Sequence, residues 1–465
     1  MQIAFCGGGS GGHLTPAIAV AEAILRQQID AQITFYISSR EIDERILSSF
    51  RWTCPQQVRR IVQPVSGVSG GRIATMAALF RSWWKCSREW KRKRPDVVVG
   101  LGGFASVPGL LAAAWLRIPI VLMEQNVVPG RANTFCRRWA TVTLAGMPWL
   151  PEIQDSWPTP VVTTGVPLAE HWFARSPAGP RGVNEPGVNG PGVNGPGVNG
   201  PGVNGRGVND ESGVNELSAQ TLHSRGPSND GHHVRLLILG GSQGAANLNR
   251  LVTAALTQLF QSESLLGNLT FDVLHQTGNN DLQTTLDRYQ ESTRIQALGS
   301  DSDTGYLSDN PSTPNVATAA TDEIAAGHRF TQRQEGGHRI RVTPFLSSVR
   351  SAMQDCDFVI SRAGAVTLAE IAVVGRASIL VPLATSRDEH QQRNAEYFQN
   401  AGACSVIDER RSQAVSELME RIRQQSVDTS FRKSQQTAAA ALNVPDAAPL
   451  CAKQVLQVGF DKIKQ

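Results

Sequence analysis

Short apolar runs alternate with amphipathic stretches along the first third of the chain, and this rhythm predicts a parallel α/β fold. Apolar residues recur at helical spacing along Pro16–Gln28 and Arg72–Arg92. Buried strands are expected before, between and after these helices, at Ile3–Cys6, Ile33–Ile37, Val97–Val99, Ile120–Leu122 and Val161–Thr164.

The same rhythm returns in the second half of the chain. Strands are expected there at Val234–Leu239, Phe271–Gln276, Phe358–Ile360 and Ser378–Val381. A chain of 465 residues suits two domains better than one. We therefore predict two Rossmann-like domains that face a cleft, residues 1–170 and 233–465, and expect the C-terminal helix to pack back on the first.

Two segments interrupt this pattern. Variants of Gly-Val-Asn-Gly-Pro repeat from Gly182 to about Asn215. Such a composition cannot bury a core, so residues 176–232 are predicted to be a disordered linker, with a partner-binding repeat as the alternative. Residues 299–338 are rich in Ser, Thr, Asp and Gly, and we expect them to form a disordered insert in the second domain.

Composition excludes several classes of protein. The seven cysteines are scattered and form no Cys-x-x-Cys pair, so neither a disulfide framework nor a structural zinc site is expected, and a reducing cytosol fits. The first 25 residues lack the layout of a signal peptide, and no run of 18 uncharged apolar residues predicts a membrane span.

A glycine-rich turn follows the first predicted strand, at Gly7–Gly12, and His13 comes next. A strand, a glycine turn and a helix start together direct backbone N–H groups at an anion. The spacing also matches a dinucleotide fingerprint. The second strand ends in Arg40 rather than an acid, which leaves NADP as the alternative ligand, and His13 as a simple loop or capping residue is the other alternative.

Polar and glycine-rich segments also follow two later strands. Gly102 and Gly103 lie in a turn after Val97–Val99, where they could share a pyrophosphate with the first turn or simply connect strand and helix. Glu124 and Asn126 follow Ile120–Leu122. Because the carboxyl ends of parallel strands face one crevice, these side chains are expected to meet sugar hydroxyls there, unless they only satisfy their own loop.

The second half repeats the arrangement. Gly240–Ala245 and Ser361–Glu370 each follow a predicted strand and open a helix, as a phosphate cradle does. Glu370 is a candidate for hydrogen bonds to a ribose diol, but Thr367 and Glu370 also have the spacing of a helix capping box. Gln391 lies one helical turn before Asn394, either facing the same crevice or on a solvated helix face.

Six of these motifs in this order resemble the MurG family of bacterial peptidoglycan N-acetylglucosaminyltransferases. They are Gly7–Pro16, Gly100–Pro108, Glu124–Gly130, Gly240–Ala245, Ser361–Glu370 and Asp388–Ala395. The resemblance implies a GT-B fold without a cofactor or a metal. It also implies inverting transfer of N-acetylglucosamine from UDP-N-acetylglucosamine to the 4-hydroxyl of the muramoyl sugar in lipid I, which gives lipid II.

The resemblance assigns residues to roles. His13 and Glu124 are the candidates for the catalytic base, and Gly102 and Gly103 for the acceptor pyrophosphate. The donor site would comprise Ser10, Gly11, Gly12, Asn126, Ser242, Gln243, Leu346, Ala365, Val366, Thr367, Leu368, Ala369, Glu370 and Gln391. Leu346 would present its backbone to uracil.

Three positions depart from the family pattern. Met123 stands where a histidine is usual, and Phe104 stands where a tyrosine is usual. Ala169 replaces an arginine that the family often places in the donor pocket, so the sequence puts the details of that wall in doubt.

Basic residues gather near one predicted helix. Residues 81–94 carry seven positive charges and one negative charge, whereas the formal charge of the whole chain is only +4. Aromatic residues interleave with them, which suits the headgroup region of an anionic membrane. An ordinary domain helix and a nucleic-acid surface are the alternatives, and no nucleic-acid fold is evident. The expected membrane contacts are Phe80, Arg81, Trp83, Trp84, Lys85 and Arg88.

The resemblance therefore implies a peripheral protein on the cytoplasmic side of the cell membrane. Its partners would be UDP-N-acetylglucosamine, lipid I, the anionic membrane and other cell-wall synthesis and division proteins, but no nucleic acid.

Overall fold

The computed structural model describes most of the chain outside the expected linker and insert. The described residues are 1–9, 11–63, 71–173, 233–241, 245–299, 331–335, 338–384 and 389–463. The linker prediction for 176–232 therefore lies outside them, as does most of the predicted insert. Ser10, Ser242 and Gln243, which were expected in the donor site, also lie outside them.

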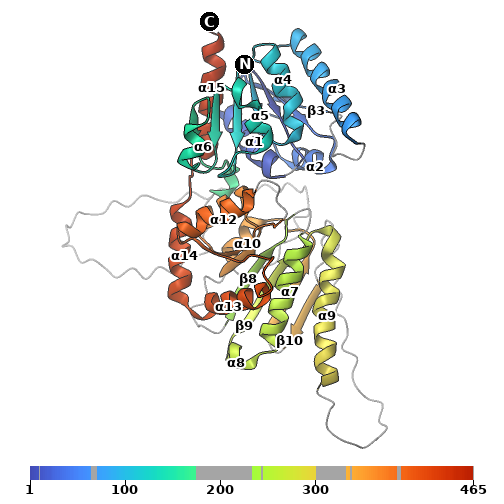
Figure 1. Cartoon of the computed structure of the whole chain (residues 1–465), viewed down its shortest axis with the longest axis vertical. Helices are drawn as coiled ribbons and strands as arrows, with labels where there is room; N and C mark the ends of the chain where they lie inside the picture. The colour runs from blue at the N-terminus through green and yellow to red at the C-terminus, as the bar shows by residue number, and fades with distance from the viewer. Residues whose placement is uncertain are drawn as a thin grey trace, which may run out of the picture. The chain divides into compact units, whose positions relative to one another are not determined.

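The first domain, drawn in blue to green in Figure 1, contains a seven-stranded, fully parallel sheet. Its strand order is β3-β2-β1-β4-β5-β6-β7. Its strands are β1 Gln2–Cys6, β2 Gln32–Ile37, β3 Val58–Val62, β4 Val97–Gly100, β5 Ile120–Glu124, β6 Val142–Ala145 and β7 Val161–Thr163. Its helices are α1 Gly11–Gln27, α2 Glu41–Ser49, α3 Gly71–Arg92, α4 Val107–Trp115, α5 Arg131–Cys136 and α6 Pro151–Asp155. The direction of crossover reverses between β1 and β4, and ligands bind at such a switch point in open α/β sheets.

Alternate residues of β1 enter two different cores. Ile3 and Phe5 pack in a core with α1 and with Cys451 and Val455 of α15 (Ala447–Ile463). Ala4 and Cys6 face the opposite core, which α3 and α4 cover. Because both faces are covered, the strands are apolar runs rather than alternating ones, and this is why the sequence predicts them.

The second domain has a seven-stranded sheet with order β10-β11-β9-β8-β12-β13-β14, parallel except for β10. Its strands are β8 His233–Leu239, β9 Thr270–Gln276, β10 Thr331–Glu335, β11 His338–Thr343, β12 Phe358–Ser361, β13 Ala377–Leu380 and β14 Cys404–Val406. Its helices are α7 Ala246–Phe260, α8 Glu263–Leu266, α9 Leu282–Gly299, α10 Val349–Asp355, α11 Ala365–Val374, α12 His390–Asn400, α13 Ala414–Val427 and α14 Thr429–Ala441. The prediction of two Rossmann-like domains is confirmed.

The end of the predicted insert needs a correction. Residues 331–335 form β10, which pairs antiparallel with β11 at the edge of the second sheet. Antiparallel pairing of a polar edge strand depends on a partner next in sequence rather than on an apolar run, so composition alone gave the wrong expectation for this stretch.

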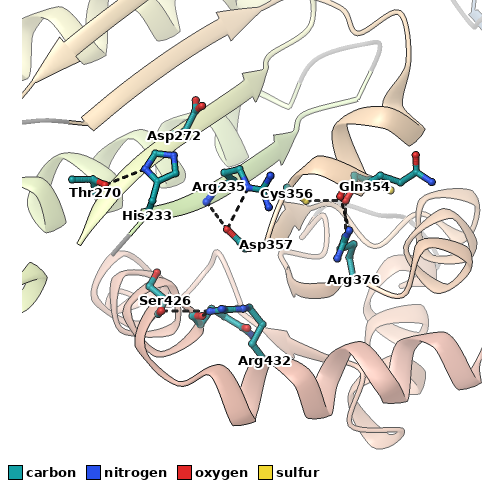
Figure 2. A network of polar contacts seen from close by, with 12 residues as sticks. His233, Arg235, Thr270, Asp272, Gln354, Cys356, Asp357, Arg376, Ser426 and Arg432 are labelled. Atoms are coloured by element: carbon teal, nitrogen blue, oxygen red, sulfur yellow. Dashed lines mark hydrogen bonds and ion pairs between the residues drawn. The ribbon is translucent and has the colours of Figure 1, made fainter. Parts of the chain in front are cut away.

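A polar network lies at the amino ends of the second sheet's strands (Figure 2). The Arg235 backbone N–H donates to Asp357 Oδ2 at 2.7 Å, and Arg376 Nε donates to the Met353 carbonyl at 2.7 Å. This network joins strands to neighbouring helices. Because ligands of parallel sheets bind at the carboxyl ends of the strands, the network is not a candidate site.

Candidate active site

The first glycine turn connects β1 directly to α1. Residues 7–9 all adopt positive φ values, which only glycine tolerates readily. α1 begins at Gly11, so Gly11 and Gly12 provide amides in its first turn. The predicted helical stretch began at Pro16, and this start was wrong because the helix begins five residues earlier, at Gly11. Pro16 has no N–H, so the Gly12 carbonyl receives no helical hydrogen bond from it.

His13 lies in the first turn of α1, and its ring lies against the second glycine turn. A Cβ atom added to Gly102 would be 3.4 Å from His13 Nε2, and one added to Gly103 would be 3.6 Å from Cε1. Burial lowers the pKa of His13, the charge of Glu124 raises it, and His390 lowers it further. The structure thus brings together one predicted base and both predicted pyrophosphate residues, and it favours a neutral imidazole.

Glu124, the other predicted base, is 4% exposed and organises its own loop. One carboxylate oxygen accepts from the Asn126 backbone N–H at 3.1 Å and from Asn126 Nδ2 at 2.9 Å. The other accepts from the Gly130 N–H and from Asn133 Nδ2, both at 2.9 Å. Both carboxylate oxygens of Glu124 are thus engaged by groups of its own loop and of α5, so the geometry favours His13 as the base.

Asn126 contacts a buried residue of α12. Asn394 Nδ2 donates to Asn126 Oδ1 at 3.0 Å and to the Ala363 carbonyl at 3.2 Å, while its Oδ1 accepts from the Val127 N–H at 3.1 Å. One asparagine therefore satisfies groups from two predicted donor-site loops. Asn394 is buried and points inward, so this side of α12 is not a solvated helix face at that position.

In the second domain, the predicted phosphate cradle forms the start of α11. The helix begins at Ala365, and Gly364 occupies the cap position without a side-chain cap. Thr367 lies inside the first turn and Glu370 in the second, so the capping-box alternative was wrong. The predicted donor residues 365–370 thus share one helix start, whose amides can bind an anion.

Glu370 is half-buried, and the described residues provide no hydrogen bond to its carboxylate. Burial raises the pKa of Glu370 to about 8. A carboxylate held in apolar surroundings without a partner is costly in the free protein, and such groups concentrate at functional sites.

Gln276 holds the second domain's first glycine turn. Its Oε1 accepts from the Gly241 N–H and its Nε2 donates to the Gly241 carbonyl, both at 3.0 Å. Nε2 also donates to the Pro344 carbonyl at 3.2 Å, which ties the turn to the loop that carries Leu346. Phe345, beside Leu346, is 53% exposed and offers an aromatic face. Sequence reasoning missed Gln276 and Phe345.

Two further contacts fix the loop after β13. Gln391 Oε1 accepts from the Leu383 N–H at 3.0 Å, so this predicted donor residue positions backbone in the free protein. Arg362 forms a buried ion pair with Glu409 at 2.9 Å, and Glu409 accepts from the Ala384 N–H at 3.1 Å. Sequence reasoning missed this ion pair because Arg362 and Glu409 are 47 positions apart in the sequence.

Asp43 is another functional candidate that sequence reasoning missed. It is fully buried, and its two carboxylate oxygens accept from the Gly9 N–H at 2.9 and 2.7 Å. A dinucleotide pyrophosphate would need that N–H, so this contact argues against the dinucleotide alternative. The available signal was an acidic residue in the first turn of the helix that follows β2.

The predicted membrane residues lie on an exposed side of α3. We call the following set the aromatic–basic surface: Phe80, Arg81, Trp83, Trp84, Lys85, Arg88, Lys91 and Trp115. Phe80, Trp84 and Trp115 are 63%, 53% and 54% exposed. The Trp83 ring lies 5.4 Å from those of Phe80 and Trp115. The core side of α3 is formed by Cys86 and Trp90, and the half-buried Trp83 packs against this core. Phe80, Trp84 and Trp115 are the exposed aromatics of the set.

Comparisons with known proteins identify the family of the chain. The profile described as the glycosyltransferase family 28 N-terminal domain matches residues 3–145, and that of the C-terminal domain matches residues 235–303 and 322–450. The fold is also that of a crystal structure of MurG from Acinetobacter baumannii, with a TM-score of 0.60 and 22% identity over 98% of this chain and 99% of that one.

Two curated relatives span nearly the whole chain. A protein of Pelobacter propionicus is 28% identical over 412 residues, or 88% of this chain and 87% of the relative. One of Trichlorobacter lovleyi is 29% identical over 468 residues, or 98% of each. Both are named UDP-N-acetylglucosamine–N-acetylmuramyl-(pentapeptide) pyrophosphoryl-undecaprenol N-acetylglucosamine transferase.

Two Rossmann-like domains with glycine turns at the carboxyl ends of their strands are typical of the GT-B fold. The match to both domain profiles specifies it further: the chain belongs to glycosyltransferase family 28 and is a UDP-sugar-dependent glycosyltransferase. The resemblance to MurG deduced from six motifs is confirmed.

Proposed function

We propose that the chain transfers N-acetylglucosamine from UDP-N-acetylglucosamine to the 4-hydroxyl of the N-acetylmuramoyl sugar in lipid I, with inversion at the anomeric carbon, to give lipid II. The observation that carries this proposal is the extent of the match. Relatives named for this transfer align over 87% and 98% of their own length, so both domains have counterparts in them.

The donor is assigned mainly to the second domain. The first-turn amides of α11 receive the diphosphate, and Glu370 accepts hydrogen bonds from the ribose hydroxyls. The described residues make no hydrogen bond to the Leu346 backbone, which leaves its N–H and carbonyl for uracil. Phe345 offers a stacking face for the base. Gly11, Gly12, Asn126, Ser242, Gln243 and Gln391 complete this assignment.

His13 is assigned as the base of the reaction. The acceptor oxygen forms a bond to the anomeric carbon as the bond from that carbon to the UDP oxygen breaks. The hydroxyl proton passes to the neutral imidazole, and the electron pair of the broken bond leaves with UDP. Helix-terminal amides stabilise the charge that develops on the diphosphate. Gly102 and Gly103 are assigned to the acceptor pyrophosphate.

The aromatic–basic surface is assigned to the cytoplasmic side of an anionic membrane, where lipid I resides. No described helix is both long and apolar enough to cross a membrane. Arg88 lies 5.3 Å from the Trp84 ring, and Lys91 lies 4.5 Å from the Trp115 ring. Aromatic rings paired with cations suit the headgroup boundary.

Replacing Arg81, Lys85 and Arg88 together by glutamine is expected to weaken binding to phosphatidylserine vesicles. Each basic residue near the surface contributes about 1 kcal/mol, so the loss is roughly 100-fold at low salt. Vesicle flotation measures it, and raising the salt concentration should shrink the effect. Glutamine at three exposed arginines of the second domain, Arg410, Arg411 and Arg421, is the matched control. Equal weakening by both triple variants would contradict the assignment.

A transfer assay with a panel of donors tests the proposed function. The purified chain is incubated with lipid I in vesicles and with labelled UDP-N-acetylglucosamine or UDP-N-acetylgalactosamine. Label is expected in the lipid fraction from the first donor, at a rate at least about 10-fold above the second, because one inverted hydroxyl misplaces a hydrogen bond. Equal rates, or transfer to lipid from neither donor, would refute the proposal.

A further inference from the structure

Asp43, the third residue of α2, is a buried carboxylate that the proposed mechanism leaves without a role. Its Oδ1 and Oδ2 lie 2.9 and 2.7 Å from the Gly9 nitrogen, and Oδ2 also accepts from the Ser38 hydroxyl at 2.5 Å. No solvent reaches its side chain. A buried charge is tolerated only where hydrogen bonds compensate the cost of removing it from water. The Gly9 N–H of the glycine turn donates one of these hydrogen bonds to Asp43.

The same segment also holds the other side of Gly9. Arg40 Nη1 donates to the Gly9 carbonyl at 2.7 Å, and the Arg40 backbone N–H donates to Ser38 Oγ at 3.3 Å. A Cβ atom added to Gly8 would lie 2.4 Å from Asp43 Oδ2, so the carboxylate packs directly on the turn. Residues 38–43 thus fix both backbone groups of Gly9.

The turn that Asp43 holds also touches the second glycine turn and precedes His13. The Gly8 carbonyl oxygen is 3.3 Å from a Cβ placed on Gly103, and His13 Nδ1 is 3.7 Å from the same point. His13 follows Gly9 by four positions in the sequence. Because these groups pack in contact, a shift of Gly9 is transmitted to the imidazole.

We propose that Asp43 is a positioning residue for the transfer reaction: it fixes Gly9, thereby orients His13 against the second glycine turn, and occupies the Gly9 N–H so that the substrate's anionic group binds to other amides. This inference rests on the proposed function, because it takes His13 as the base.

The charge of Asp43 has a second consequence for His13. The groups that act on His13 come from three elements: Asp43 from α2 and Glu124 from β5 raise its pKa, while His390 from α12 lowers it, as does burial. Neutralising Asp43 removes one of the two contributions that raise the pKa, so the pKa of His13 should fall.

Two substitutions separate geometry from charge. In Asp43→Asn, Oδ1 still accepts from the Gly9 N–H, while Nδ2 can no longer accept from Gly9 or from the Ser38 hydroxyl and donates to Ser38 Oγ instead. One contact to the turn is thus kept while the charge is lost. We expect the kcat of this variant to stay within about 5-fold of wild type. The acidic limb of its kcat–pH profile should move to lower pH, because His13 with a lower pKa stays neutral down to a lower pH. In Asp43→Ala, the turn is released and kcat should fall about 100-fold, as a misplacement of about 1 Å does.

The KM for UDP-N-acetylglucosamine should change less than about 3-fold in both variants, because loss of positioning acts on kcat. Asp96→Ala is the matched control, since Asp96 Oδ2 accepts from the Gln2 N–H at 2.7 Å at the opposite end of β1. It should lower the melting temperature but leave kcat within about 2-fold of wild type.

An NMR titration of the histidine rings in the ligand-free protein tests the inference without an assay of transfer. The His13 resonance should titrate at lower pH in Asp43→Asn than in wild type. An unchanged or higher pKa, or an Asp43→Ala variant whose kcat equals that of Asp96→Ala, overturns the inference. If Asp43→Ala does not fold, Ser38→Ala and Asp43→Asn carry the test. If wild type fails to transfer sugar, the proposed function fails, and the titration then reports only whether the charge of Asp43 acts on His13.

Discussion

Replacing His13 by alanine should reduce kcat by roughly 100- to 10,000-fold, the range in which a positioned general base contributes. The KM for UDP-N-acetylglucosamine should stay within about 3-fold, because the proposed donor contacts lie mainly in the second domain. Steady-state transfer rates at saturating donor and lipid I measure both parameters.

The physical reason is the state of the imidazole. Burial lowers the pKa of His13, so the ring is neutral at physiological pH and can accept the proton of an acceptor hydroxyl. In wild type, kcat should rise with pH through the pKa of His13, and the alanine variant should lose that acidic limb.

Glu124 offers the competing explanation, and the pH profile separates the two. Glu124→Gln places an amide NH2 where hydrogen-bond donors already converge, so the loop at 124–130 should lose stability while the acidic limb persists. His171→Ala is the control for a histidine of the same domain outside the site. An alanine variant of His13 with an intact acidic limb and near-normal kcat would contradict the assignment.

Glu370→Gln should weaken UDP-N-acetylglucosamine binding by roughly 10- to 100-fold at pH 9, the value of hydrogen bonds to a charged group. The pKa of Glu370 in the free protein is about 8 because burial disfavours its charge. The ribose hydroxyls donate best to the ionised form, so wild-type affinity should rise as pH increases through about 8. The glutamine variant should show little pH dependence in calorimetric titrations between pH 6 and 9.

The stability of the free protein should change in the opposite direction. The folded state keeps the Glu370 proton up to about pH 8, whereas the unfolded state loses it near the ordinary pKa of a glutamate, 4.5. Stability is therefore lost as pH rises between these values. The melting temperature of Glu370→Gln should equal that of wild type near pH 4 and exceed it at pH 9.

Glu420→Gln, at an exposed glutamate of α13, is the matched control, and its folded-state pKa is lowered by Arg423. It should leave donor affinity unchanged. A Glu370→Gln variant that binds the donor as tightly as wild type at pH 9 would show that the carboxylate does not contact the ligand.

The sequence predicts those strands and turns of the molecule that a pattern of neighbouring residues determines. Strands buried on both faces, such as β1 and β8, appear as apolar runs, and glycine turns appear beside them. β3 was missed because it carries Arg59 and Arg60 at the edge of the sheet. β6 was also missed, although it is no shorter than β4, which was predicted. Local pattern cannot identify a strand that tertiary pairing stabilises.

Helix starts show the same limit. Pro16 suggested the first turn of α1, but two glycines and His13 precede it in the helix. The capping-box spacing of Thr367 suggested a helix start there, although Gly364 is the cap. In both places the glycine turn determines where the helix begins. The helix-capping preferences of Pro16 and Thr367 do not determine it.

The rest of the site consists of contacts between residues that are far apart in the sequence, and the spacing of residues along the chain does not predict such contacts. Asp43 reaches Gly9, and Asn394 reaches Asn126 and Ala363. A buried polar side chain needs partners wherever the fold brings them, so such residues become visible only once the fold is known.

The measurement that tests the central claim most directly is the structure of the product made by the purified protein from UDP-N-acetylglucosamine and lipid I. Mass spectrometry and NMR of the lipid fraction should show one added N-acetylglucosamine, joined through a β bond to the 4-hydroxyl of the muramoyl sugar. An α bond, attachment at another hydroxyl, or free N-acetylglucosamine with unchanged lipid I would contradict the account.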